Sequence, residues 1–185
     1  EVMGRYAGWI ALHSGMAAGA HAVLIPEIPF DLGPVAATIQ QREERGAKFS
    51  IVVVAEGATP LDGEVSTVGK AVGQAEQLGG IGAKVAAGLH ELTGKETRTV
   101  VLGHLLRGGT PTSIDRILGL RFGAAAIRAL ETGHNGVMVS LDPPHVTYVP
   151  LVGATHRMKS VPLDGDTVVT ARDLGINFGD RMPLP

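Results

Sequence analysis

The sequence predicts an α/β domain, a three-layer Rossmann-like sandwich built around a mostly parallel sheet. Strand-length apolar runs alternate with longer helix-like stretches, which is the pattern of crossover connections. The continuous β-branched run at 49–55 indicates a strand buried on both faces. The 26 glycines among 185 residues are about twice the typical usage and indicate many tight turns.

The expected elements follow in order along the chain. Helices are predicted at 5–20, about 33–45, 81–93, 114–131 and, as a short final helix, near 154–159. Strands are predicted at 21–25, 49–55, 98–102, 137–141 and 145–149. The glycine-rich stretch 57–80 is interpreted as a loop with room for one short helix, and 103–113 as a polar loop.

Composition narrows the classes of function. The net charge of −2 gives no global positive field for nucleic acid, so any anion site must be local. There is no cysteine for a disulfide framework or a thiolate metal site, the apolar runs are too short to span a bilayer, and no signal peptide is recognised. The opening residues from Glu1 do not resemble a natural N-terminus, so we expect residues 1–185 to be one domain of a longer chain.

The strongest candidate site follows the strand predicted at 98–102. His104 and Arg107 stand three residues apart before the pair Gly108-Gly109. A guanidinium fits phosphate oxygens, a histidine can donate to the same anion or to a sugar hydroxyl, and glycines let backbone amides approach an anion. The alternative is a surface loop with solvated charges.

Arg98 begins that strand and has a different relation to the site. An extended chain at about 3.3 Å per residue places it roughly 20 Å from His104. The two side chains are therefore not expected to hold the same small ligand within one subunit. Arg98 either serves a site on a neighbouring subunit or is an ordinary arginine at a strand edge.

Two further candidates lie at the start of the chain and after the central strand. Met3, Gly4 and Arg5 open the first predicted helix, where the Gly4 amide would face a ligand. Glu56 follows the strand at 49–55, where ligands of open α/β sheets bind, and can accept hydrogen bonds from sugar hydroxyls. The alternatives are a helix start with a solvated arginine, and a turn or cap residue.

Taken together, four segments resemble the phosphofructokinase family. They are Met-Gly-Arg-x-x-Gly from residue 3, Pro-Glu-x-x-Phe from residue 26, the strand followed by Glu56, and Arg-x-x-x-Leu-Gly-His-x-x-Arg-Gly-Gly-x-Pro-x-x-x-Asp-Arg from residue 98. The resemblance covers at least residues 1–140 in order and approximate spacing. The stretches 56–58 and 8–10 resemble more closely the actinobacterial-type branch, which includes both ATP- and pyrophosphate-dependent members.

The resemblance implies a role for each matching residue. Met3, Gly4 and Arg5 match the segment that contacts fructose 6-phosphate, and Glu56 matches the carboxylate that binds a sugar hydroxyl. These roles would make the chain the C-terminal, sugar-phosphate-binding half of a 6-phosphofructokinase, which forms fructose 1,6-bisphosphate in glycolysis.

The remaining matches concern the phosphate and the neighbouring subunit. His104 and Arg107 match the pair that holds the 6-phosphate. Arg98 matches an arginine that reaches the substrate site of an adjacent subunit, so a cytoplasmic homodimer or homotetramer is implied.

The resemblance also implies what this segment lacks. The aspartate thought to act as base, the site for Mg²⁺ and the site for ATP or diphosphate belong to the family's other half. The isolated 185-residue chain is therefore expected to be inactive, with no catalytic or metal-binding residue of its own. The alternative is a non-catalytic sugar-phosphate-binding or regulatory subunit of the same superfamily.

One position departs from the family pattern. Bacterial allosteric members have an acidic effector-site residue where this sequence has His21. Because a histidine cannot replace a carboxylate in holding the effector's metal, the usual nucleotide control is not expected here.

Overall fold

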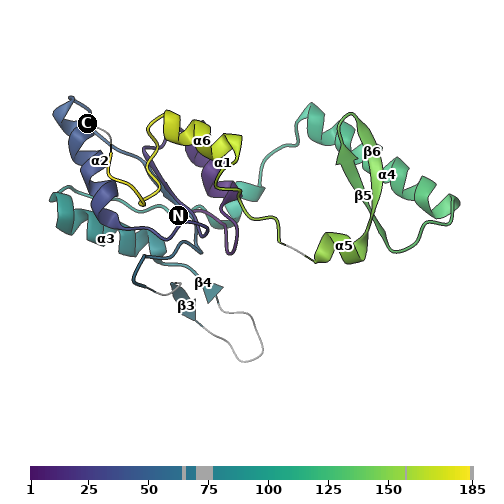
Figure 1. Cartoon of the computed structure of the whole chain (residues 1–185), viewed down its shortest axis with the longest axis horizontal. Helices are drawn as coiled ribbons and strands as arrows, with labels where there is room; N and C mark the ends of the chain where they lie inside the picture. The colour runs from purple at the N-terminus through teal and green to yellow at the C-terminus, as the bar shows by residue number, and fades with distance from the viewer. Residues whose placement is uncertain (64–65, 70–76, 157, 184–185) are drawn as a thin grey trace. The chain divides into compact units, whose positions relative to one another are not determined.

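The computed structural model describes residues 1–63, 66–69, 77–156 and 158–183 (Figure 1). The chain forms two compact units, one of Glu1–Leu106 with Ser160–Pro185 and the other of Arg107–Lys159. Each unit is described by itself. The assignment of 1–185 to one domain of a longer protein stays a prediction.

The first unit is built on parallel strands. β1 (Ala22–Leu24) pairs with β2 (Val52–Val54) in parallel register, Ala22 opposite Val52. Single parallel bridges extend this array on both sides, from Val2 to Ala55 and from Ala22 to Asn177. The predicted α/β fold with a parallel sheet is confirmed.

Four helices cover these strands: α1 (Trp9–Ala17), α2 (Leu32–Glu44), α3 (Ile81–Thr93) and α6 (Asp166–Asp173). Asp31 caps α2 by accepting a hydrogen bond from the Gly33 amide at 2.8 Å, and α3 ends at Gly94 with φ +69°. The sequence predicted α2 within one residue at each end and α3 with both bounds.

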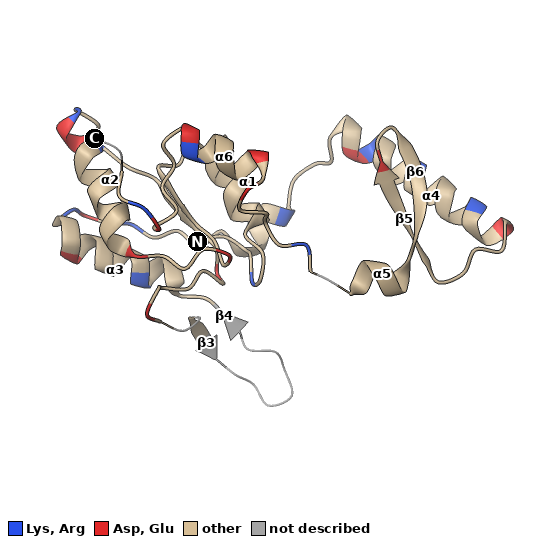
Figure 2. Cartoon of the chain, viewed as in Figure 1, with Lys and Arg blue, Asp and Glu red and all other residues tan. Residues whose placement is uncertain are grey.

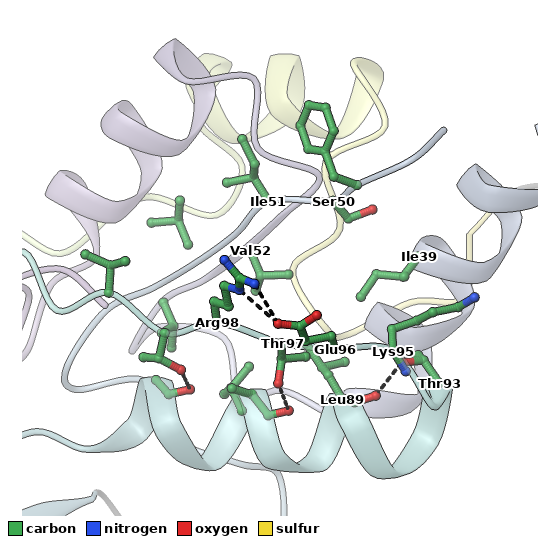
Figure 3. Close-up of a pocket in the computed structure, with 18 of the residues that line it drawn as sticks. Ile39, Ser50, Ile51, Val52, Leu89, Thr93, Lys95, Glu96, Thr97 and Arg98 are labelled. Atoms are coloured by element: carbon green, nitrogen blue, oxygen red, sulfur yellow. Dashed lines mark hydrogen bonds and ion pairs between the residues drawn. The ribbon is translucent and has the colours of Figure 1, made fainter. Parts of the chain in front are cut away.

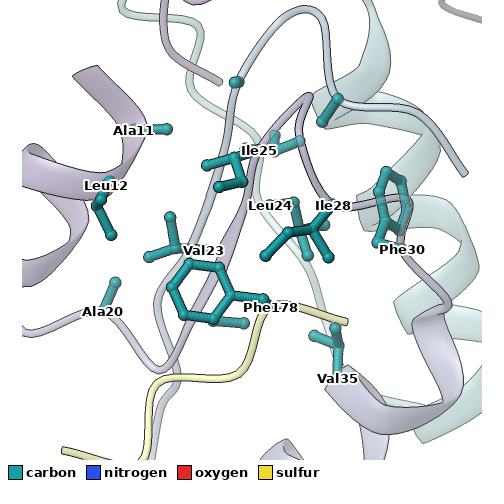
Figure 4. Close-up of a cluster of buried hydrophobic side chains, with 14 of the residues drawn as sticks. Ala11, Leu12, Ala20, Val23, Leu24, Ile25, Ile28, Phe30, Val35 and Phe178 are labelled. Carbon is teal, nitrogen blue, oxygen red and sulfur yellow. The ribbon is translucent and has the colours of Figure 1, made fainter. Parts of the chain in front are cut away.

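The core fills the space between these layers. Its largest fully buried side chains come from the helices, from β1 and the residue after it, and from the C-terminal segment: Leu12, Val23, Leu24, Ile25, Val35, Ile81, Val168 and Phe178. In Figure 4, Ala11 and Leu12 of α1 lie on one side of the β1 residues, while Val35 of α2 and Phe30 lie on the other. Burial of this apolar surface holds the carboxyl ends of the strands in fixed positions.

Three predicted elements of the first unit differ from the structure. The first helix begins at Trp9, not Arg5, because Val2 pairs with Ala55 and Gly4 has φ +147°, which no helix accommodates. The strand at 49–55 is confined to Val52–Val54, and Phe49 is 70% exposed, so burial of both faces is wrong at its start. Residues 98–102 do not form a strand of the described sheet.

Part of the glycine-rich stretch is also strand. β3 (Thr67–Gly69) and β4 (Gln77–Leu78) pair antiparallel, where the sequence predicted a loop with room for one short helix. The residues between these two strands lie outside the described part of the chain, so that prediction is not tested there.

The second unit contains a long helix beside a hairpin. Its elements are α4 (Ser113–Glu131), β5 (Val137–Asp142), β6 (His145–Pro150) and the short α5 (Leu151–Thr155). The bounds predicted for a short helix near 154–159 are wrong, because α5 begins directly after its N-cap Pro150 and ends at Thr155. The two strands are antiparallel, and the Tyr148 hydroxyl donates to the carbonyl of Ala125 on α4 at 2.9 Å. A capping box between Thr112 and Asp115 starts α4 within one residue of the predicted position.

Charge is mixed over the surface. Figure 2 shows Lys and Arg interspersed with Asp and Glu on both units of the described chain. No helix among the described residues has the length and apolar character needed to cross a membrane. The mixed charge means that any anion site on this chain would be local.

Candidate functional site

Two loops meet where the parallel strands end. The Val2 amide donates to the Val54 carbonyl at 2.9 Å, and the Glu56 amide donates to the Val2 carbonyl at the same distance. One residue further, the Gly57 amide donates to the Gly4 carbonyl at 3.0 Å. The segments 3–5 and 56–58, more than fifty residues apart in sequence, are thus held side by side at the edge of the sheet where open α/β folds bind ligands.

Glu56 faces this junction with its carboxylate. The Gly4 amide donates to Glu56 Oε1 at 3.3 Å, and Glu56 is half-buried. An ionised carboxylate has about four acceptor positions, so one backbone amide leaves capacity for further donors such as sugar hydroxyls. The predicted ligand-accepting position of Glu56 is therefore compatible with the geometry.

Glycine is required on both sides of the junction. A Cβ on Gly57 would lie 1.9 Å from the Arg5 carbonyl oxygen, which is far inside van der Waals contact. Gly4 has φ +147° and would bring a Cβ to 3.2 Å from the Cβ of Ala55. The close approach of the two backbones is what places Glu56 beside residues 3–5.

Met3 and Arg5 lie on this loop and are both half-buried. The Arg5 guanidinium carbon is 5.7 Å from the centroid of the Tyr6 ring. The expectation that the Gly4 amide sits at a helix N-terminus is wrong, because α1 begins five residues after Gly4 and its N-cap is Gly8. The Gly4 amide instead donates to the Glu56 carboxylate.

Glu27 fixes the end of the same loop where it enters α1. Its carboxylate accepts the Gly8 amide at 3.0 and 3.1 Å and the Val161 amide at 2.8 Å. It thereby joins the N-terminus of α1 to the start of the C-terminal segment. The sequence indicated only a rigid loop between Pro26 and Asp31; the place of Glu27 just after a strand was the available signal for this role.

His104 and Arg107 lie on one short 3₁₀ helix, η1 (Gly103–Arg107), in the stretch predicted to be a loop. Gly103 has φ +49°, and the Leu105 amide donates to the Leu102 carbonyl at 3.0 Å. Side chains at i and i+3 of a 3₁₀ helix eclipse one another, so the pair share a face. Both side chains are exposed. Arg107 is the first residue of the second unit.

Arg98 is separate from the junction of residues 3–5 with Glu56. Its guanidinium pairs with Glu96 at 2.9 Å, and the two side chains are 85% and 76% exposed. Its neighbours Thr97 and Thr99 donate to the carbonyls of α3 residues Ala86 and Gly82. An exposed pair of this kind contributes little to stability, so Arg98 can exchange its partner readily.

The residues of this chain do not form a metal site where the structure describes them. No group of three or more His, Asp or Glu side chains there is arranged to hold an ion.

His21 has a structural contact. Its Nδ1 accepts the Ile51 amide at 2.9 Å, which links the residue before β1 to the residue before β2. The pKa of His21 is lowered from its usual value, first by burial and next by the nearby charge of Arg42. The expected loss of effector control at His21 stays a prediction.

The lowered pKa predicts a pH dependence of stability. The unfolded chain binds a proton at His21 more readily than the folded chain does. The contribution of neutral His21 to the stability of the folded state is therefore fully present above about pH 6.5, and it is lost as the pH falls through the folded-state pKa. Thermal unfolding at about pH 7.5 and about pH 5.5 should therefore show a smaller drop in Tm for His21→Gln than for the parent. The exposed His13→Gln is the control, and an unchanged drop in His21→Gln would refute the prediction.

The fold and this junction define an α/β protein with polar groups gathered at the carboxyl ends of its parallel strands. The phosphofructokinase family model matches residues 1–130. This chain belongs to the phosphofructokinase family.

Relatives of known name agree with that assignment. The chain is 48% identical over 182 residues to the ATP-dependent 6-phosphofructokinase of Chloroflexus aurantiacus, covering 98% of this chain and 50% of the relative. It is 48% identical over 164 residues to the ATP-dependent 6-phosphofructokinase 3 of Streptomyces coelicolor, covering 88% and 48%. The chain therefore spans about half the length of the curated relatives it matches.

Solved structures show the same fold. The pyrophosphate-dependent phosphofructokinase of Marinobacter aquaeolei matches with a TM-score of 0.72 at 23% identity, over 100% of this chain and 48% of that one. The phosphofructokinase of Pichia pastoris, solved in the T-state, matches with a TM-score of 0.66 at 28% identity, over 94% and 17%.

Proposed function

We propose that this chain is the fructose 6-phosphate-binding half of a 6-phosphofructokinase, which transfers a phosphoryl group to the sugar 1-hydroxyl. The junction of residues 3–5 with Glu56 is the observation that carries the proposal. It places a carboxylate, a half-buried arginine and a close backbone turn together at the carboxyl ends of neighbouring parallel strands. That is where an α/β protein binds a polar ligand.

The chemistry divides among the residues. The Glu56 carboxylate accepts hydrogen bonds from sugar hydroxyls, and residues 3–5 contact the sugar phosphate. His104 and Arg107 hold the 6-phosphate, to which a guanidinium donates in bidentate, charge-assisted fashion. Their common face on η1 supports this role.

The rest of the catalytic apparatus belongs to the other half of the protein. In phosphoryl transfer, positioning and charge neutralisation supply most of the acceleration, so a segment that only orients the acceptor still contributes to catalysis. Relatives at 48% identity are named ATP-dependent, which favours ATP over diphosphate as the donor. Mg²⁺ is expected with the donor, on the other half.

Assembly completes the proposal. Arg98 reaches the substrate site of a neighbouring subunit, so the protein works as a homodimer or homotetramer in the cytoplasm. Its exposure and its exchangeable partner Glu96 support this role. Oligomerisation would then be part of the active site.

Arg107→Ala in the full-length protein tests the proposal. Loss of a charge-assisted hydrogen bond should cost about 1.5 to 3 kcal/mol, which raises the Kd for fructose 6-phosphate roughly 10- to 150-fold. Calorimetric titration measures the affinities for the sugar phosphate and for the donor separately, and the affinity for the donor should change little. Arg128→Ala, on an exposed position of α4, is the matched control.

Two results would contradict the proposal. One is an Arg107→Ala protein with the parent's affinity for fructose 6-phosphate. The other is formation of fructose 1,6-bisphosphate by residues 1–185 alone, which serve as the inactive control in the same coupled assay.

A further inference from the structure

A groove of about 880 Å³ opens in the first unit, beside β2. Figure 3 shows Ser50, Ile51 and Val52 along one side and the segment Glu96, Thr97 and Arg98 along the other. The floor is apolar and includes Val85 and Leu89 of α3, each only 4% exposed. The backbone of residues 50–52 and of residues 96–98 lines opposite sides of the groove.

The wall formed by β2 presents backbone groups to the groove. Backbone groups of alternate strand residues point to opposite sides. Ala55 donates to Leu24 of β1, and the Ile51 carbonyl accepts from His21, so odd-numbered residues face β1. The Val54 carbonyl accepts from Val2 at the end of the groove, so the backbone groups of Val52 face the groove as well.

The opposite wall has the same arrangement. The Val100 carbonyl accepts from the Glu1 nitrogen at 2.8 Å, and the Leu102 amide donates to the Glu1 carbonyl at 3.0 Å. The backbone groups of Arg98 therefore face the groove, while Thr97 and Thr99 anchor the segment to α3. Among the described residues, no hydrogen bond crosses the groove between Val52 and Arg98.

Glu1 and Val2 show what fits between these walls. Val2 is bridged in parallel to Ala55 on one side, and Glu1 is hydrogen-bonded to Val100 and Leu102 on the other. These two residues thus pair in parallel with both walls, and the rest of the groove lies on the N-terminal side of Glu1. The curated relatives are about twice as long as this chain, so the full-length protein has chain available to fill it.

We propose that the stretch of the full-length protein running into Glu1 lies in this groove as a parallel β-strand. It completes the sheet between β2 and the segment 97–100, and pairs with both walls. Burial of its apolar side chains on Val85 and Leu89 adds to the backbone hydrogen bonds. The segment 98–102, predicted to be a strand, then becomes one by gaining this partner.

A second copy of the chain fits the groove less well. A free sheet edge offers backbone groups on one side only, whereas this groove demands them on both. Only a single extended strand with both of its edges free can form hydrogen bonds with both walls. The inference concerns assembly of the sheet and holds whether or not the sugar-phosphate site works as proposed.

Hydrogen exchange in the full-length protein, resolved to single residues, tests the pairing. Val53 and Ala55 face β1, and Val52 and Val54 face the groove, so one strand contains its own control. A filled groove should slow the Val52 and Val54 amides to within about tenfold of Ala55. Exchange of those two amides more than about 100-fold faster than Ala55 would overturn the proposal.

A disulfide identifies the occupant. The bonds of Glu1 place it opposite Val101, so the third residue before Glu1 lies opposite Arg98. A cysteine at that residue should oxidise with Arg98→Cys within one chain, since paired strand positions have suitable Cα separations and no other cysteine occurs in residues 1–185. Thr99→Cys, whose side chain faces α3, is the control and should not couple.

Three outcomes would refute the identity of the occupant. They are no disulfide with Arg98→Cys, equal coupling with Thr99→Cys, and a disulfide found only between two copies of the protein. The last would make a second copy the occupant.

Discussion

Replacing Gly57 with alanine should force apart the two loops that meet at the end of the sheet. The new Cβ would lie 1.9 Å from the Arg5 carbonyl oxygen, and backbone atoms cannot rotate away as a flexible side chain could. The hydrogen bond from the Gly57 amide to the Gly4 carbonyl would be lost with the contact. Overpacking and one lost hydrogen bond together predict a decrease of about 3 kcal/mol in the free energy of unfolding.

The same substitution should weaken the sugar-phosphate site. Glu56 is the residue beside Gly57, and its carboxylate is positioned by the Gly4 amide across the junction. Denaturant unfolding measures the stability, and titration of the full-length protein with fructose 6-phosphate measures the site. A loss of affinity of at least about tenfold is expected, since displacement of a ligand-binding group by about 1 Å is costly.

Gly119→Ala is the matched control for this experiment. Gly119 lies within α4, where a Cβ meets nothing within 4 Å, so alanine there should raise stability by about 0.5 to 1 kcal/mol. If Gly57→Ala changes the free energy of unfolding by less than about 0.5 kcal/mol, the close approach of the two loops has no energetic importance.

The sequence predicted the parts of the fold that depend on local pattern. Alternation of strand-length and helix-length apolar stretches was enough to locate α2 and α3. Glu56 was identified because it directly follows an apolar run, which is a property of sequence alone. A residue's place at a strand end is local information, so such positions can be found without coordinates.

Features that depend on distant partners could not be predicted in this way. The start of α1 was placed too early because Ala, Leu and Met favour a helix, while the pairing of Val2 with Ala55 draws the opening residues into the sheet. Glu27 accepts hydrogen bonds from Gly8 and Val161, which lie 19 and 134 residues away from it in sequence. No pattern within one window of sequence contains such a contact.

The burial of Phe178 also depends on residues far away in sequence, and its replacement should have a large effect on stability. Its neighbour Asn177 is bridged in parallel to Ala22, and the Asn177 side chain donates to Thr38 Oγ1 at 2.9 Å and accepts the Gly179 amide at 2.7 Å. Phe178 is itself fully buried, with the Arg172 guanidinium 4.8 Å from its ring centroid. The C-terminal segment is thus bridged to β1 and held by the hydrogen bonds of Asn177 together with one fully buried aromatic side chain.

Phe178→Ala should lower the free energy of unfolding by about 3 to 5 kcal/mol, because it removes a fully buried ring and leaves a cavity. Phe178→Leu keeps most of the apolar volume and should cost less than about half of that. Leu174→Ala, at a position 70% exposed just after α6, is the control and should change stability by no more than about 0.5 kcal/mol.

The size of the alanine effect separates two descriptions of the C-terminal segment. If residues 176–179 only cover the surface of the unit, the segment can detach while β1, β2 and their helices stay folded, and Phe178→Ala would cost little in global unfolding. If the segment is part of the sheet, Ala22 and Val23 lose their partner Asn177 together with the ring. Denaturant unfolding of the three variants in parallel distinguishes them, and a Phe178→Ala loss no larger than that of Leu174→Ala would rule out the second description.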